Sequence, residues 1–354
     1  RARPLPAPAR TRRLRAHGRQ LGDQRADDAT QSVEHLVEEV AYEHWHRMLF
    51  ARFLAGNDLL MYPDPVEPIP VSLQECEDLA ADEEAANGWE LAARYATRML
   101  PQIFRNDSPV FELSLPPEHQ QALEKLVAGL PAAVFTTSDA LGWVYQFWQS
   151  KRKEDINKSE TKIGERELPA VTQLFTEPYM VTFLLDNSLG AWWAAKVLDT
   201  LDDEALAQMD EISLRKACSL PGMPLEYLRF VRDEPPMDAN GRQSDSESIR
   251  VDSHSFAVPS WSPAAGSFDA WPDGLAEFTL MDPCCGSGHF LVAAFLMLVP
   301  MRMELEGLSA REAADRVLTE NLHGLELDKR CVELAAFALA LTAWTYPEED
   351  GNAI

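Results

Sequence analysis

The sequence predicts an α-helical amino-terminal region followed by the start of a doubly wound α/β sheet. From residue 33 onwards, apolar side chains recur at the spacing of one helix face, beginning with Val33, Leu36 and Val37. From about residue 275 the pattern changes to strand, helix, helix, strand, helix. Where the first of these strands meets its helix, the chain reads LMDPCCGSGHFL (280–291). A strand, a glycine turn and a buried helix in this order are typical of a Rossmann-like sheet.

Composition and charge exclude several classes of protein. The 354 residues carry a formal net charge of −25, and residues 1–26, with eight Arg and one Asp, leave −32 for the remainder. Because this field repels phosphates, composition argues against a nucleic-acid-binding surface within these residues. No apolar run reaches the ~18 residues of a membrane span, and the first 26 residues lack the apolar stretch of a secretory signal. Five scattered cysteines favour a reducing compartment, so we expect a cytoplasmic protein without membrane association.

Shifts in composition and periodicity divide the chain into five predicted segments. They are an Arg- and Pro-rich disordered tail (1–30), a helical amino-terminal domain (31–165), a helical segment with a threonine-containing motif (166–232), a linker rich in Pro, Gly, Ser and Asp (233–274), and the first part of the sheet domain (275–354).

Local signals predict where individual helices and strands begin and end in the segments 166–232 and 275–354. Strands over 277–281 and 321–327 are expected to be parallel and adjacent, because the connection between them is helical. The remaining signals are Thr176 as the cap of a helix that runs to about Asn187, an interruption of the buried helix at Pro300, a capping box at Ser309 and Glu312, and Asp328 as the cap of a last helix from Lys329 to about Trp344.

The turn at 283–288 offers two kinds of chemistry, one from its cysteines and one from its glycines. A thiol nucleophile needs an activating base, and His289 is the only candidate nearby. Cys284 and Cys285 have no C-x-x-C partner elsewhere, so a metal site is not expected. The cysteines are therefore interpreted as small side chains that fill space behind the turn, and the glycines as the functional residues.

Glycine backbone can approach a ligand closely, and the start of the following helix offers amides to an anionic group. Asp282 can accept hydrogen bonds from a cationic group, and Glu326, at the end of the second strand, can accept from both hydroxyls of a ribose. The turn is not a dinucleotide fingerprint, because Leu291 stands where the third glycine is required, and it is not a P-loop. A ligand with an amino-acid end and a nucleoside end, S-adenosylmethionine, fits this pattern best.

These residues resemble a known family, the N6-adenine DNA methyltransferases. Residues 282–291, DPCCGSGHFL, are similar to the family's first motif, and HGLELD (323–328) is similar to its second. LFTEPYMVTFLLDNSLG (174–190) resembles the motif that precedes the sheet, although Glu177 stands where the family has proline. The resemblance implies that S-adenosylmethionine is bound by Thr176, Asp282, Pro283, Gly286, Ser287, Gly288 and Glu326, without a metal.

The helical region before the threonine motif, with LGWVYQFWQS (141–150), narrows the resemblance to the large methylases of type IIG restriction systems and BREX-type phage-defence systems. These enzymes hold the flipped adenine with an [N/D/S]-P-P-[Y/F/W] motif, which does not occur here; EPPM at Glu234 lies in the linker. No catalytic residue is therefore assigned. We expect the amino-terminal portion of a longer methylase that is inactive alone and contacts double-stranded DNA, and restriction or defence subunits, through other regions. The alternative is a non-catalytic scaffold with a vestigial pocket.

Overall fold

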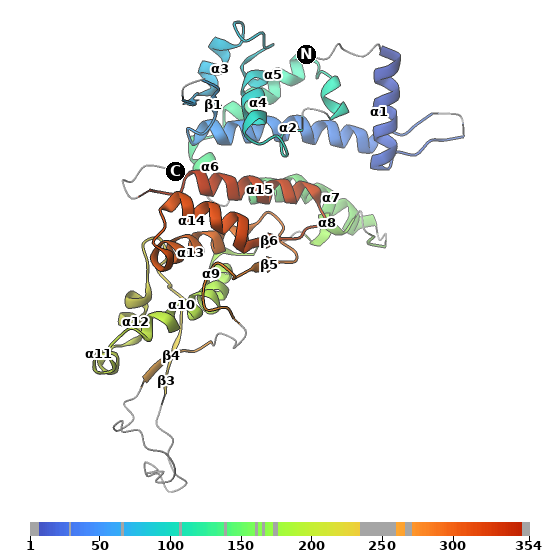
Figure 1. Cartoon of the computed structure of the whole chain (residues 1–354). Coiled ribbons are helices and arrows are strands. Elements are labelled where there is room, and N and C mark those ends of the chain that lie inside the picture. The colour runs from blue at the N-terminus through green and yellow to red at the C-terminus, as the bar shows by residue number, and fades with distance from the viewer. Residues whose placement is uncertain are drawn as a thin grey trace. The chain divides into compact units, whose positions relative to one another are not determined.

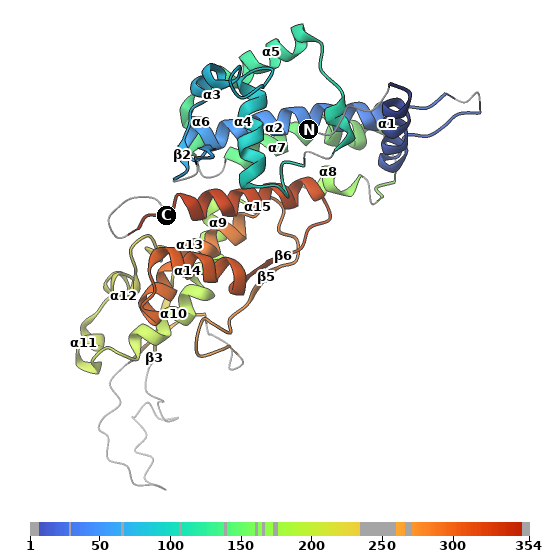
Figure 2. The same ribbon diagram turned by 45° about the horizontal axis from the view of Figure 1, so that its top comes forward.

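The structure, a computed structural model, describes residues 7–27, 30–64, 67–105, 108–137, 140–159, 162–164, 167–172, 176–233, 260–265 and 271–348. The chain divides into two compact units, Arg1–Ala140 and Leu141–Ile354. Figures 1 and 2 show the elements of each unit in two views. Within the described residues, no helix combines the length and apolar character needed to cross a membrane.

The first unit is built on one long helix. This helix, α2 (Glu34–Gly56), packs against helices from both earlier and later in the chain, as Figure 1 shows. The other elements of the unit are α1 (Ala7–Leu21), β1 (Met61–Tyr62), β2 (Ile69–Pro70), α3 (Leu73–Leu79), α4 (Gly88–Met99), η1 (Pro109–Glu112), α5 (Pro117–Ala128) and α6 (Ala132–Thr136). Strands β1 and β2 pair antiparallel.

The expectation of a disordered tail over residues 1–30 is wrong for α1. Its Leu14 is buried against Leu36 and Val110, which belong to α2 and η1. Asp23, just after α1, accepts hydrogen bonds from the backbone amides of His35 and Leu36 at 2.9 and 3.2 Å. Composition missed this helix because its one buried leucine gives no periodic signal, and contacts from distant residues stabilise it.

The second unit carries the predicted sheet region. Its elements are α7 (Ala140–Ser159), α8 (Leu168–Thr172), α9 (Pro178–Asp186), α10 (Leu189–Leu198), α11 (Asp203–Gln208), α12 (Glu211–Cys218), β3 (Phe230–Asp233), β4 (Ser260–Pro263), β5 (Leu280–Asp282), α13 (His289–Glu306), α14 (Ala310–Arg316), η2 (Val317–Asn321), β6 (Leu322–Gly324) and α15 (Lys329–Trp344). Helices α9, α14 and α15 all pack against α13.

Strands β5 and β6 pair in parallel, with Leu280 opposite Leu322 and Asp282 opposite Gly324. This confirms the predicted pairing and direction, although each strand is only three residues long. Strand β6 ends at Gly324, three residues before the predicted end at 327. It begins one residue later than predicted because the preceding π-helical turn η2 extends through Asn321, whose buried side chain donates to the carbonyls of Leu275 and Phe278 at 2.7 Å. Two strands do not establish a doubly wound sheet, so the Rossmann-like fold of this region remains a prediction.

Helix α13 does not end at Pro300, contrary to the prediction. It runs from His289 to Glu306 with Pro300 in its interior, and Gly307 caps it in the left-handed conformation at φ 66°. The residues on either side of the proline, Val299 and Met301, are fully buried. Core packing of both neighbouring turns therefore outweighs the hydrogen bond that an interior proline removes.

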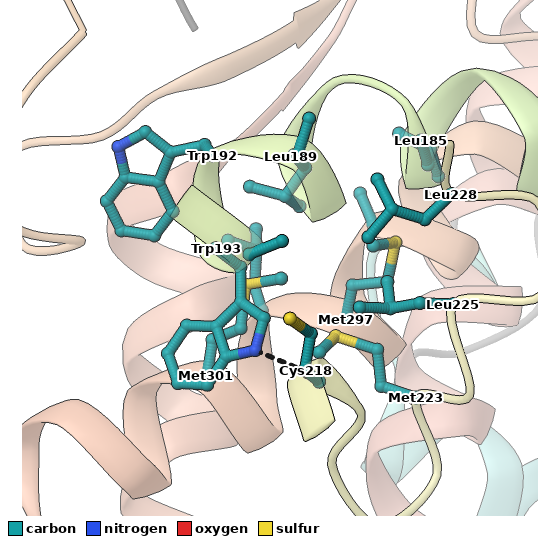
Figure 3. Packing of buried hydrophobic residues seen from close by; sticks show 14 of the residues in the cluster. Leu185, Leu189, Trp192, Trp193, Cys218, Met223, Leu225, Leu228, Met297 and Met301 are labelled. Atoms are coloured by element: carbon teal, nitrogen blue, oxygen red, sulfur yellow. Dashed lines mark hydrogen bonds between the residues drawn. The ribbon is translucent and has the colours of Figure 1, made fainter. Parts of the chain in front are cut away.

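A large apolar core fixes the segment after Thr176 to helix α13. Figure 3 shows Trp193 of α10 close to Met301 of α13, with Met223 and Leu225 packing nearby. The indole Nε1 of Trp193 donates to the carbonyl of Cys218 at 2.8 Å, so the ring is buried with its one polar group satisfied.

The ends of the predicted linker over 233–274 form structure. Strand β3 pairs antiparallel with β4, with Phe230 opposite Pro263 and Asp233 opposite Ser260. Composition gave no strand signal at β4, because its sequence SWSP is short and ends in proline. Most of this predicted linker, including EPPM at 234–237, lies outside the described residues.

Candidate functional site

The glycine turn continues the pairing of β5 and β6 beyond the strand ends. The amide of Leu325 donates to the carbonyl of Asp282 at 2.9 Å, and the amide of Cys285 donates to the carbonyl of Leu325 at 3.0 Å. The Asp282 side chain accepts from the amide of Cys284 at 3.0 Å, which tightens the start of the turn. The turn and the loop after β6 are therefore held together as one site.

The two glycines of the turn have different surroundings. Both have a positive φ, 52° at Gly286 and 88° at Gly288. A Cβ added at Gly286 would meet nothing within 4 Å, whereas a Cβ at Gly288 would lie 3.0 Å from the Cα and Cβ of Ala335 in α15. Gly286 thus faces open space, and Gly288 allows the start of α13 to pack closely on α15. The predicted approach of a ligand at Gly288 therefore has a competing structural explanation.

Glu326 connects the loop after β6 to the glycine turn. Its Oε2 accepts from the amide of Gly286 at 2.9 Å, and its Oε1 accepts from the amides of Leu327 and Asp328 at 2.7 and 3.0 Å. The carboxylate therefore lies at the glycine turn, 40 residues from Gly286 in sequence, and its contact with a ribose stays a prediction. Three backbone amides also occupy most of its acceptor capacity.

The other predicted residues of the turn are in different environments. Pro283 is exposed, whereas Ser287 is buried with 4% of its surface accessible. The Oγ of Ser287 has no hydrogen-bond partner within the described part of the chain. A buried hydroxyl of this kind has unused donor and acceptor capacity at the edge of the turn.

Thr176 is half-buried and lies two residues before α9. The prediction that Thr176 caps this helix is wrong. Glu177 occupies the N-cap position, without a capping side-chain hydrogen bond, and Pro178 begins the helix. The predicted end is confirmed, since Asn187 caps the carboxyl end. Helix α9 packs on α13, whose first turn follows Gly288. A direct approach of Thr176 to the glycine turn remains a prediction.

The two cysteines differ, and only one is a buried filler. Cys285 is buried in a cluster with Leu291 and Ala335. Burial, aided by the nearby charges of Asp282 and Glu326, raises its thiol pKa to about 11, so the thiol stays protonated at neutral pH and is a poor nucleophile. Cys284 is exposed, which contradicts its predicted role as a filler. The sequence could not separate these adjacent residues, because the turn directs their side chains differently.

Helix α7 contributes residues that the sequence analysis did not assign to the site. The Tyr145 hydroxyl donates to Oδ2 of Asp328 at 2.5 Å, and Nε2 of Gln149 donates to the Tyr145 oxygen at 2.6 Å. A Cβ added at Gly142 would lie 3.0 Å from the His289 ring and 3.1 Å from Ser287 Oγ. Spacings of three and four residues place Gly142, Tyr145 and Gln149 on one face of α7. This spacing is the one sequence signal for a shared face, but the other aromatic residues of LGWVYQFWQS mask it in the sequence pattern.

Comparisons with known proteins show what the site is similar to. Residues 265–350 match the family model described as MmeI, DNA-methyltransferase domain. The chain is 26% identical to the adenine-specific methyltransferase PglX of Lacticaseibacillus casei (strain Zhang) over 93% of the chain and 27% of that protein. It is 25% identical to the adenine-specific methyltransferase BrxX of Escherichia coli O9:H4 (strain HS) over 88% of the chain and 25% of that protein. The chain thus spans about a quarter of the length of these relatives. The matches confirm the resemblance to adenine methylases that the motifs indicated.

Proposed function

We propose that this chain is the cofactor-binding, amino-terminal portion of an adenine-specific DNA methyltransferase of the type IIG or BREX phage-defence kind. Its reaction would transfer the methyl group of S-adenosylmethionine to N6 of adenine in DNA. The observation that carries the proposal is the bond between Gly286 and Glu326, which joins the glycine turn to the acid after the second parallel strand. The match of residues 265–350 to a DNA-methyltransferase domain covers both of these residues.

The site has groups that suit each part of the cofactor. The open space at Gly286 admits a ligand to the backbone, and Ser287 offers an unused hydroxyl at the same turn. Leu327, directly after Glu326, is 75% exposed and offers an apolar surface to a base. Because three amides already bond to Glu326, accepting both hydroxyls of a ribose requires the Gly286 amide or another donor to be released. S-adenosylmethionine, when bound, supplies the activated methyl group.

We propose that double-stranded DNA, and any restriction or defence subunits, are bound by parts of the longer protein outside these residues. The formal net charge of −25 disfavours a DNA surface here. The matched relatives are about four times as long as the aligned chain, which leaves ample length for DNA recognition.

Glu326→Ala is expected to weaken S-adenosylmethionine binding at least tenfold. The substitution removes the ribose acceptor, the bond from the Gly286 amide that joins the loop to the turn, and the two bonds within the loop from the amides of Leu327 and Asp328. Isothermal titration calorimetry with the 354-residue chain measures the effect. Glu304→Ala serves as the matched control, because Glu304 is an exposed acid on α13 away from the turn. Equal affinity of the wild-type chain and Glu326→Ala would contradict the assignment of Glu326.

The 354 residues by themselves are expected not to methylate DNA. They contain no [N/D/S]-P-P-[Y/F/W] motif to hold the adenine amino group in line with the methyl donor, and such positioning contributes several kcal/mol to catalysis (roughly 7–11 kcal/mol at most). The measurement is incorporation of tritiated methyl groups into mixed-sequence duplex DNA, with an active adenine methylase as positive control. Incorporation above that of Glu326→Ala would show that a catalytic centre lies within these residues.

The same experiments separate the cofactor-binding proposal from the alternative, a non-catalytic scaffold. A scaffold with a vestigial pocket predicts no calorimetric signal with S-adenosylmethionine, whereas a cofactor-binding portion predicts a saturable signal that depends on Glu326.

A further inference from the structure

Helix α7 contacts both halves of the site through residues one turn apart. At Gly142 the backbone of α7 lies against the glycine turn, so close that an added Cβ would be 3.0 Å from His289 and 3.1 Å from Ser287. At Tyr145 the helix reaches the loop after β6 through the hydroxyl bond to Asp328. These contacts join residues more than 140 positions apart in the sequence.

The direction of the hydrogen bonds follows from the chemistry of the groups. The Asp328 carboxylate only accepts, and its Oδ1 already accepts from the amide of Arg330 at 3.0 Å as the cap of α15. The Tyr145 hydroxyl therefore donates to Oδ2, which leaves its oxygen to accept from Gln149. Burial, and then the Asp328 charge, raise the pKa of Tyr145, so the donor keeps its proton.

The environment makes this bond a strong one. The Tyr145 side chain is fully buried, and Gln149 is 4% exposed. A hydrogen bond from a neutral donor to a charged acceptor is roughly twice as strong as one between neutral groups, and burial strengthens it further. Asp328 is also two residues from Glu326, and its own amide donates to Glu326. Fixing Asp328 therefore restricts the loop that carries the proposed ribose acceptor.

We propose that α7 is a clasp for the cofactor site, in which Tyr145 is a positioning residue for the Glu326–Asp328 loop and Gly142 allows the helix to lie on the glycine turn. Docking of α7 and binding of the cofactor then favour each other, and undocking of α7 opens the site. The identity of the ligand rests on the function proposed above, but the clasp itself rests on the contacts of Gly142, Tyr145 and Asp328.

The first test is Tyr145→Phe in the 354-residue chain, which removes the hydroxyl and keeps the ring. We expect hydrogen exchange of the Leu327, Asp328 and Arg330 amides to rise about tenfold, and S-adenosylmethionine to bind about tenfold more weakly, the size of effect expected for one hydrogen bond to a charged group. Tyr95→Phe is the matched control. Tyr95 is equally buried, but it belongs to the first unit, and its hydroxyl has no hydrogen-bond partner within the described residues.

A second measurement distinguishes positioning from simple packing. If α7 is a clasp, saturating S-adenosylmethionine must slow exchange of the α7 amides in the wild-type chain, because linkage is reciprocal, and this slowing must be lost in Tyr145→Phe. A residue that only fills the core would change exchange throughout the second unit and leave the ligand-induced slowing in place. That result, or unchanged exchange at 327–330, overturns the clasp.

A second variant and a measurement that does not need the ligand cover two cases, a Tyr145→Phe chain that does not fold and a wild-type chain that does not bind S-adenosylmethionine. If Tyr145→Phe does not fold, Asp328→Ser is used instead. The serine hydroxyl can still cap α15, but no second oxygen is left to accept the hydrogen bond from Tyr145. The same rise in amide hydrogen exchange at 327–330 is expected. If the wild-type chain does not bind S-adenosylmethionine, the proposed function fails, and the clasp is judged by exchange alone. A rise in amide hydrogen exchange confined to residues 327–330 in Tyr145→Phe then supports the clasp, and no rise there overturns it.

Discussion

Arg302→Met is expected to lower the free energy of unfolding of the second unit by about 1.5–3 kcal/mol, the size expected for loss of hydrogen bonds to charged groups, because the partners Glu306 and Glu320 are 22% and 42% exposed and water can hydrate them. Arg302 is fully buried in α13. Its Nε and Nη2 donate to the two carboxylate oxygens of Glu306 at 2.8 and 2.9 Å, and its Nη1 donates to Glu320 and Asn321 at 2.6 and 3.1 Å. Methionine fills part of the volume but leaves these acceptors without their donor.

The effect of Arg302→Met should extend to the glycine turn. Asn321 precedes β6 and bonds to the carbonyls of Leu275 and Phe278, which lie before β5. The Arg302 network thus fixes the register of the two parallel strands as well as the end of α13. We therefore expect weaker S-adenosylmethionine binding in this variant even under conditions in which it remains folded.

Hydrogen exchange of the α13 amides in increasing urea measures this free energy for the second unit alone. Arg311→Met is the matched control, since Arg311 is 64% exposed and, among the residues that the structure describes, forms an ion pair with Glu348 at 3.6 Å. Exposed pairs of this kind contribute little, so the urea midpoint of this control should stay close to that of the wild-type chain. A midpoint for Arg302→Met equal to that of Arg311→Met would show that the buried network does not stabilise the unit.

The parts of the fold that the sequence predicted depend on short-range signals. The capping box of Ser309 and Glu312 and the cap at Asp328 are both present in the structure, because each needs residues only two or three positions apart. The parallel pairing of β5 and β6 was also predictable, since a helical connection between adjacent strands leaves few alternatives.

The parts that the sequence missed depend on contacts between distant residues. The bond from Tyr145 to Asp328 spans 183 positions, and no pattern within α7 indicates its partner. Helix α1 and the passage of α13 through Pro300 depend on packing that outweighs local propensity. For the same reason Gly286 and Gly288 looked equivalent in the motif, although only Gly288 packs against α15.

Gly288→Ala and Gly286→Ala should therefore affect the protein in different ways. At Gly288 an L-residue is strained at φ 88°, and its Cβ would press on the backbone of Ala335 at 3.0 Å. We expect a loss of about 2–4 kcal/mol in unfolding free energy, from roughly 1–2 kcal/mol of backbone strain and a similar cost of overpacking. At Gly286 only the backbone term of about 1 kcal/mol applies, because the added Cβ meets no atom within 4 Å.

The loss of cofactor affinity should be larger for Gly286→Ala than for Gly288→Ala, the opposite of the order for stability, when it is measured at a temperature at which both variants are folded. The methyl group of Gly286→Ala enters the open space at the turn, so this variant should lose most of its affinity for S-adenosylmethionine, whereas the methyl group of Gly288→Ala points at α15. Thermal unfolding and calorimetric titration of the same two preparations measure both properties, and each variant is the control for the other. If Gly286→Ala binds as tightly as the wild-type chain, the ligand does not approach the turn at Gly286. If the two variants are equally stable, the close packing of the turn on α15 does not determine stability, and the strain of a positive φ alone accounts for the requirement for glycine at both positions.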